Sequence, residues 1–205
     1  FISTDRCLCS EEAFVRKKPF GAQVLLDSVT SWLPFGPLDG AQNVASNVRG
    51  CFGGGYGPSA ETDTIDFITI TSLGNATDFG DRTIAGGYPA GHSNQVRSVN
   101  LGGYTTPTVS NVIDYITIAQ TGNAVDFGDS TQNAISPAGV GNGTRGIFAG
   151  GYAPAPGTII EYVTMASQGN AISFGSITPA GRRFMSPAAS STRGVFFGGR
   201  LNPTA

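Results

Sequence analysis

Apolar residues in this chain come in short runs, separated by glycine, asparagine, aspartate and proline. The three clearest runs begin with an isoleucine followed by an acidic residue, and they occupy residues 65–70, 113–118 and 160–165. They are rich in β-branched and aromatic residues, which favour extended strands. Large apolar residues fall on both sides of each strand, a pattern typical of sheets that are covered on both faces. We therefore predict strands here, in sheets packed between other sheets.

A second kind of apolar run precedes each of these strands and recurs at a fixed spacing. It starts at an arginine and leads to a pair of glycines. The arginines are Arg49, Arg97, Arg145 and Arg193, each 48 residues after the one before. In three copies a Gly-Asn-Ala turn, a strand containing Phe-Gly and a stretch of small residues complete the unit. Four strands in about 48 residues is the size of one blade of a β-propeller.

The sequence therefore predicts an all-β fold, a β-propeller of about four blades in one domain over residues 1–205. Each blade is a four-stranded antiparallel sheet. The expected units are a degenerate repeat at 1–48, clear repeats at 49–96, 97–144 and 145–192, and a closing strand at 193–205. The alternative is an open section of a larger propeller, closed by residues outside this chain or by another subunit.

The two ends of the chain carry complementary parts of one repeat. Residues around 177–200 supply the first two strand types, and residues around 22–37 supply the last two. Joined, they form one composite blade and leave no unpaired sheet edge. Residues 10–18 carry helix signals, a capping serine followed by acids and then bases, which predict one or two helical turns there.

Composition narrows the class of partner. Only 13% of the 205 residues are charged and the net charge is −2, which gives no electrostatic attraction for nucleic acid. No apolar stretch approaches the roughly 20 residues needed for a membrane helix, so we expect no membrane insertion. Cys7, Cys9 and Cys51 do not form a disulfide framework. Buried thiols are favoured over a zinc site that these cysteines would form with His92.

The double glycine, the aromatic residue beside the acid of the next strand and the later aromatic residue resemble Kelch-like β-propeller repeats. Phe79, Phe127 and Phe174 stand where Kelch repeats usually have tryptophan. The string from Ile113 to Asp129 is also similar to a repeat that is frequent in virion structural proteins of marine phages and cyanophages. This resemblance implies a tail, fibre or capsid-surface component located in the virion. The implied partners are other virion proteins, further copies of the chain and a host-surface glycan or receptor.

Two repeated side chains are candidates for binding. In a ring, the four arginines would lie at one level around the axis, where they could bind an anion or a glycan. Alternatively, each guanidinium bonds backbone carbonyls or an acid of a neighbouring unit, such as Asp66, Asp114 or Glu161. Tyr56, Tyr104 and Tyr152 follow the double glycines and either form an aromatic platform for a sugar or protein, or cover the blade ends.

Catalytic chemistry has little support in the sequence. With His92 as the only histidine, a histidine-based triad or a multi-histidine metal centre is hard to assemble. Asp78, Asp81, Asp126 and Asp129 carry oxygen ligands at short spacing that suit Ca²⁺, although capping of their own turns explains the same pattern. We therefore expect no enzyme activity, no cofactor and no metal. The alternatives are a lectin-like propeller and a glycan-processing enzyme that uses loop carboxylates.

Overall fold

The computed structural model describes residues 48–152, 157–177 and 180–201, and every regular element in these ranges is a β-strand. The account below concerns the unit that begins at Val48. The predictions made for residues 1–47 lie outside the described residues. These are the degenerate repeat, the helical turns at 10–18 and the strands near 22–37.

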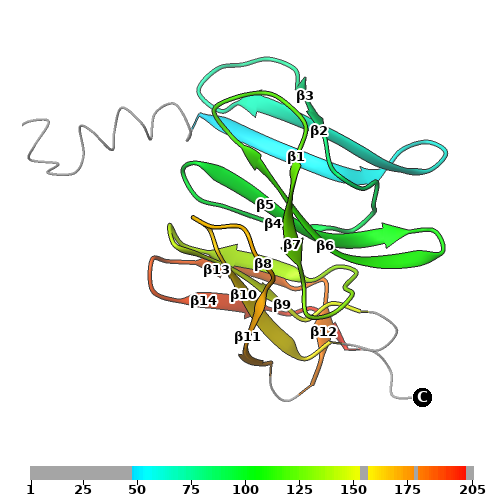
Figure 1. Cartoon of the computed structure of the whole chain (residues 1–205), viewed down its shortest axis with the longest axis vertical. Helices are drawn as coiled ribbons and strands as arrows, with labels where there is room; N and C mark the ends of the chain where they lie inside the picture. The colour runs from blue at the N-terminus through cyan, green and yellow to red at the C-terminus, as the bar shows by residue number, and fades with distance from the viewer. Residues whose placement is uncertain (1–47, 153–156, 178–179, 202–205) are drawn as a thin grey trace, which may run out of the picture. The chain divides into compact units, whose positions relative to one another are not determined.

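Two four-stranded antiparallel sheets form the centre of this unit (Figure 1). The middle sheet contains, in spatial order, β4 (Ala90–Ser93), β5 (Arg97–Thr105), β6 (Thr108–Thr117) and β7 (Val125–Asp129). The following sheet contains, in the same order, β8 (Ala138–Gly141), β9 (Arg145–Ala149), β10 (Ile159–Thr164) and β11 (Ile172–Ser176). The predictions of an all-β fold and of four antiparallel strands per repeat are confirmed in these two sheets.

The sheets on either side of these two contain some, but not all, of the four strands of the repeat. Before the middle sheet lie β1 (Arg49–Tyr56), β2 (Glu61–Thr69) and β3 (Thr77–Asp81), which match β5, β6 and β7. After the last full sheet, two short pairs complete the described chain. These are β13 (Ser186–Ala189) with β14 (Gly194–Phe197), and β12 (Arg182–Arg183) with β15 (Arg200–Leu201).

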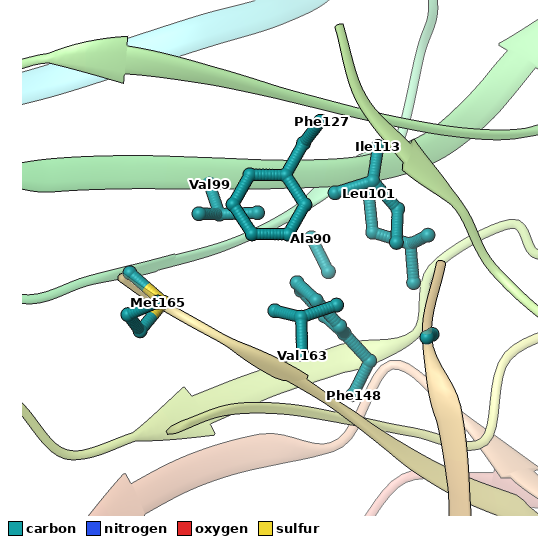
Figure 2. Packing of buried hydrophobic residues seen from close by; sticks show 9 residues of the cluster. Ala90, Val99, Leu101, Ile113, Phe127, Phe148, Val163 and Met165 are labelled. Carbon is teal, nitrogen blue, oxygen red and sulfur yellow. The ribbon is translucent and has the colours of Figure 1, made fainter. Parts of the chain in front are cut away.

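The apolar side chains that face the next sheet are buried between the sheets. The largest cluster joins the middle sheet to the one that follows it, and Figure 2 shows Phe127 and Val99 facing Val163 and Met165. Phe127 is 2% exposed and Met165 is 1% exposed. This arrangement explains why the strands are apolar on both sides, because each sheet contributes to a core on each face.

Backbone contacts also join successive sheets. The turn before β7 docks on β3 of the preceding sheet, where Gly122 N donates to Phe79 O at 2.8 Å. The side-chain oxygen of Asn123 accepts from Asp81 N at 3.1 Å. Gly80 has a φ of +141°, and a Cβ there would lie 2.6 Å from the Gly122 carbonyl. A side chain at this position would therefore prevent the two sheets from docking.

The next interface repeats this contact with the same residue types. Gly169 N donates to Phe127 O at 2.8 Å, and the side-chain oxygen of Asn170 accepts from Asp129 N at 3.0 Å. A Cβ at Gly128 would again lie 2.6 Å from backbone, in this case the Gly169 carbonyl. The Gly-Asn-Ala motif therefore has two roles. It turns the chain within its own sheet and joins that sheet to the preceding one.

Candidate functional site

The repeated arginines contact aromatic rings and backbone carbonyls. The guanidinium of Arg97 lies 4.7 Å from the ring centroid of Tyr115, and its Nη1 donates to Met165 O of the next sheet at 3.1 Å. Arg49 does the same with Phe67, at 4.8 Å, and with a carbonyl of the middle sheet, at 2.7 Å. The sequence analysis offered two roles for the arginines, anion binding and hydrogen bonding to backbone carbonyls. The contacts of Arg49 and Arg97 match the second role.

The other two arginines lie toward the C-terminal end of the described chain. Arg145 stacks on Tyr162 at 4.5 Å from its ring centroid. Both Arg145 and Arg193 are exposed. The four arginines thus have the same place in the repeat but different surroundings, and among contacts between described residues the first two join one sheet to the next.

Two of the three acids suggested as arginine partners, Asp114 and Glu161, bind other residues. Asp114 is fully buried and pairs with Arg82, whose Nε lies 3.1 Å from its Oδ2, and both side chains are 0% exposed. The amide of Thr83 also donates to Asp114, at 3.2 Å. Glu161, the equivalent acid in the next sheet, accepts from the amide of Thr131 at 2.9 Å and from the hydroxyl of Ser130. These carboxylates therefore satisfy donors at the end of the preceding sheet.

Of the four carboxylates considered as calcium ligands, Asp78 has a local hydrogen-bond partner. The side chain of Asp78 accepts a hydrogen bond from Gly80 N at 3.1 Å, which is the turn-capping alternative. The Asn123 side chain, which is near Asp126 and Asp129 in the sequence, accepts a hydrogen bond from a backbone amide of the preceding sheet. Within the described ranges, no three His, Cys, Asp or Glu side chains gather as metal ligands.

The histidine and the described cysteine are both partly buried. His92 lies on β4, with its Nε2 3.4 Å from Asn142 O of the following sheet, and burial lowers its pKa below the ordinary value. Cys51 is a free thiol whose pKa is raised by burial. Both groups are therefore held in their neutral forms near neutral pH, packed within or between sheets.

Aromatic rings from two repeats meet on one surface of the described chain. The ring centroids of Tyr56 and Tyr88 lie 5.2 Å apart, and those of Tyr88 and Phe184 lie 6.0 Å apart, both edge to face. The guanidinium of Arg183 lies 5.2 Å from the Phe184 ring and 4.7 Å from the Tyr152 ring. We call these five residues the aromatic cluster.

The backbone explains why this cluster forms. Tyr88, Ser136 and Phe184 occupy the same repeat position, and their φ angles are 58°, 55° and 55°. This left-handed conformation is uncommon for residues other than glycine. Ser136 N donates to Tyr88 O at 3.0 Å, and Phe184 N donates to Ser136 O at 3.2 Å. The hydrogen-bonded row brings together side chains from repeats that are two units apart.

The cluster is open to solvent and carries a positive charge. Tyr56, Tyr88 and Phe184 are 52%, 49% and 51% exposed. Partial burial and then the nearby Glu61 carboxylate raise the pKa of the Tyr56 hydroxyl, so it stays protonated. A hydrogen bond from Thr106 Oγ1, at 2.6 Å, in turn lowers the pKa of Glu61. The surface therefore offers aromatic faces beside a guanidinium, with a carboxylate near Tyr56.

Sequence reasoning identified part of this cluster. Of the predicted tyrosines, Tyr56 and Tyr152 belong to it, whereas Tyr104 is half-buried and pairs through its backbone with Gly87. Tyr88, Arg183 and Phe184 were missed. The signal for two of them was present, because residues 88, 136 and 184 follow the same 48-residue spacing as the arginines.

Comparison of the sequence with protein-family models gives no match, and comparison with curated proteins gives no significant match. In the part of the chain that the structure describes, no helix is long and apolar enough to span a membrane. The role of the aromatic cluster is therefore inferred from its own chemistry.

Proposed function

We propose that this chain is a non-catalytic adhesion module that binds a glycan through the aromatic cluster. The observation that carries the proposal is the row of three half-exposed rings from two repeats, flanked by Arg183. A sugar ring presents C–H groups on one face, and these pack on aromatic faces, which carry the negative side of the ring quadrupole. The guanidinium adds a donor fork that suits a sugar carboxylate or hydroxyl pair.

The described carboxylates support a non-catalytic role over the alternative of a glycan-processing enzyme. Asp114 and Glu161 are the two buried acids, and their oxygens accept hydrogen bonds from structural donors. Asp78 caps its own turn. Glycoside hydrolysis needs two carboxyl groups facing each other across a cleft. These three acids instead accept hydrogen bonds from groups that hold a turn or join two sheets.

For the fold, we propose a Kelch-like β-propeller of about four blades. Two observations support it. Successive sheets are joined by the same turn-to-strand contact, and the Tyr88 and Phe184 rings, two repeats apart, touch each other. Repeats two units apart lie opposite each other across a narrow four-fold axis, whereas a larger ring would separate them. The resemblance to phage repeats extends the proposal to a virion component whose other faces contact virion proteins or further copies.

A glycan array followed by titration of any hit tests the binding role. Tyr88→Ala and Phe184→Ala should each weaken binding at least about tenfold, which corresponds to about 1.4 kcal/mol. Truncating a central aromatic contact often costs more than this. Arg183→Gln should weaken acidic glycans more than neutral ones. Phe52→Ala is the control, because Phe52 is 60% exposed and lies outside the aromatic cluster.

The proposal is wrong if the wild-type chain binds no glycan, or if both cluster variants bind as well as the wild type. A urea unfolding curve for each variant separates loss of the surface from loss of the fold.

A further inference from the structure

Charge is distributed unevenly along the repeats. Residues 48–161 carry nine acids and four arginines, whereas residues 162–205 carry four arginines and no acid. These last arginines are Arg182, Arg183, Arg193 and Arg200. The acid that precedes this stretch, Glu161, is 1% exposed and bonded to Ser130 and Thr131. The C-terminal stretch therefore carries positive charge that no acid within it neutralises.

Two of these arginines face each other on the ribbon formed by β12 and β15. Arg183 and Arg200 are directly opposed in its antiparallel register. Side chains at opposed positions share one face, with their Cβ atoms about 5 Å apart, and like charges there repel each other. Arg182 alternates to the other face, and its Nη1 donates to Gly198 O at 3.0 Å. One face of the ribbon therefore brings two positive charges together.

The same face adjoins the aromatic cluster. The guanidinium of Arg183 stacks on the rings of Tyr152 and Phe184, and its buried Nε has no hydrogen-bond partner among the described residues. Stacking orients the plane of a guanidinium and leaves its N–H donors free for an acceptor in that plane. Arg200 is exposed. A ligand that covers the aromatic cluster can therefore contact both arginines.

We propose that the glycan bound by this chain is acidic, and that a sugar carboxylate lies between Arg183 and Arg200 while sugar rings pack on the aromatic cluster. The inference rests on the glycan-binding function proposed above. It adds the substrate class and one residue, Arg200, that lies outside the aromatic cluster. A carboxylate is planar and accepts two parallel hydrogen bonds from one guanidinium. Its negative charge also removes the repulsion between the two arginines, which a neutral sugar cannot do.

Single-stranded nucleic acid also combines anionic groups with rings that stack on aromatic side chains, but the charge distribution disfavours it. Such a ligand needs a positive path along several phosphates. Here two guanidinium groups are opposed at one place, and the net charge of the whole chain is −2. The surface therefore suits a single anionic group beside apolar ring faces, which is what a uronic acid offers.

Titration with uronic acid oligomers tests this substrate class. The probes are oligomers of galacturonate, of mannuronate and of hyaluronan, each also prepared as its methyl ester, which removes the charge and keeps the sugar rings. At least one acidic oligomer should bind, and esterification should weaken its binding at least about tenfold. Raising the salt concentration from about 0.05 to about 0.5 M should weaken the acidic form and leave the ester nearly unchanged.

Two exposed arginines give a matched pair of variants. Arg200→Gln should weaken the acidic oligomer at least about tenfold and leave its ester unchanged. Arg193→Gln is the control, because it removes the same charge from the same acid-free stretch, outside the ribbon. It should keep most of the binding. Arg200→Lys should recover part of the affinity, since an ammonium keeps the charge without the fork.

The inference is overturned if no acidic oligomer binds, if Arg200→Gln and Arg193→Gln weaken binding equally, or if a single-stranded oligothymidylate binds more tightly than every acidic oligomer. If neutral glycans still bind and Tyr88→Ala or Phe184→Ala weakens them, the glycan-binding function stands and only the acidic class is wrong. A chain that binds neither acidic nor neutral glycans refutes both proposals.

The unliganded chain gives a second readout. Because Arg200 is exposed and faces a like charge, Arg200→Gln should leave the urea midpoint unchanged or raise it slightly. A saturating acidic oligomer should raise the midpoint of the wild type more than that of Arg200→Gln, because only the wild type binds it tightly. A midpoint lowered by Arg200→Gln without ligand would make Arg200 a structural ion-pair partner and contradict the proposed role.

Discussion

The buried pair of Arg82 and Asp114 gives the sharpest test of how the sheets are held together. Its side chains are 0% exposed, and the guanidinium also donates to Gly102 O at 3.2 Å. Asp114→Ala would leave the Arg82 charge buried without its counter-ion. Breaking one partner of a buried pair costs about 3–5 kcal/mol. The free energy of unfolding of a typical domain is about 5–15 kcal/mol. The variant should therefore unfold at a much lower urea concentration.

The repeat supplies a matched control for this change. Asp66 has the same position in the β1–β3 sheet but is exposed, so Asp66→Ala should change the free energy of unfolding by about 0.5 kcal/mol or less. Replacing both members of the pair, with Arg82→Met and Asp114→Leu, should restore most of the lost stability, because no buried charge is left unpaired. If Asp114→Ala and Asp66→Ala give the same unfolding curve, the pair is not a main contact between these sheets.

Three further changes test the remaining contacts. Burial lowers the folded-state pKa of His92, so the unfolded chain binds the proton first as the pH falls. The free energy of unfolding should therefore decrease below about pH 6.5. This decrease should be smaller in His92→Asn. Arg97→Ala should cost about 1–2 kcal/mol in urea unfolding, from the lost ring contact and carbonyl bond, whereas the exposed Arg200→Ala should cost almost nothing. Phe127→Ala should cost about 3–5 kcal/mol by leaving a cavity between two sheets, and a loss below about 1 kcal/mol would contradict the packing in Figure 2.

Contacts within a repeat could be predicted from the sequence because they follow periodicity. The strand positions and the antiparallel four-stranded sheets follow from the alternation of apolar runs and turns, and the structure confirms them. The partners of particular side chains could not be predicted. Asp114 was considered for the repeated arginines but binds Arg82, which belongs to no repeated set. Which residue faces a buried acid depends on how two sheets are offset, and a single sequence carries no direct signal for that offset.

The aromatic cluster was difficult to predict for the same reason. Tyr88 and Phe184 have the same repeat position, so their spacing was visible, but spacing alone does not show that rings two repeats apart touch. That contact depends on three left-handed residues joined by backbone hydrogen bonds. Tyr88 and Phe184 are not residue types that usually adopt this conformation, so the usual sequence signal for it, a glycine, is absent.

The two buried acids show how the same contact is kept while its residues change. Asp114 has a short side chain and faces the long Arg82, whereas Glu161 has a longer side chain and faces the short Ser130 at the equivalent position. In each case the carboxylate also accepts from the amide of the threonine that follows, Thr83 or Thr131. The backbone contact is therefore the constant part, and the side chains on either side change in length together. Two sheets in one chain can thus keep nearly the same separation with a buried ion pair at one interface and a hydroxyl-to-carboxylate bond at the next.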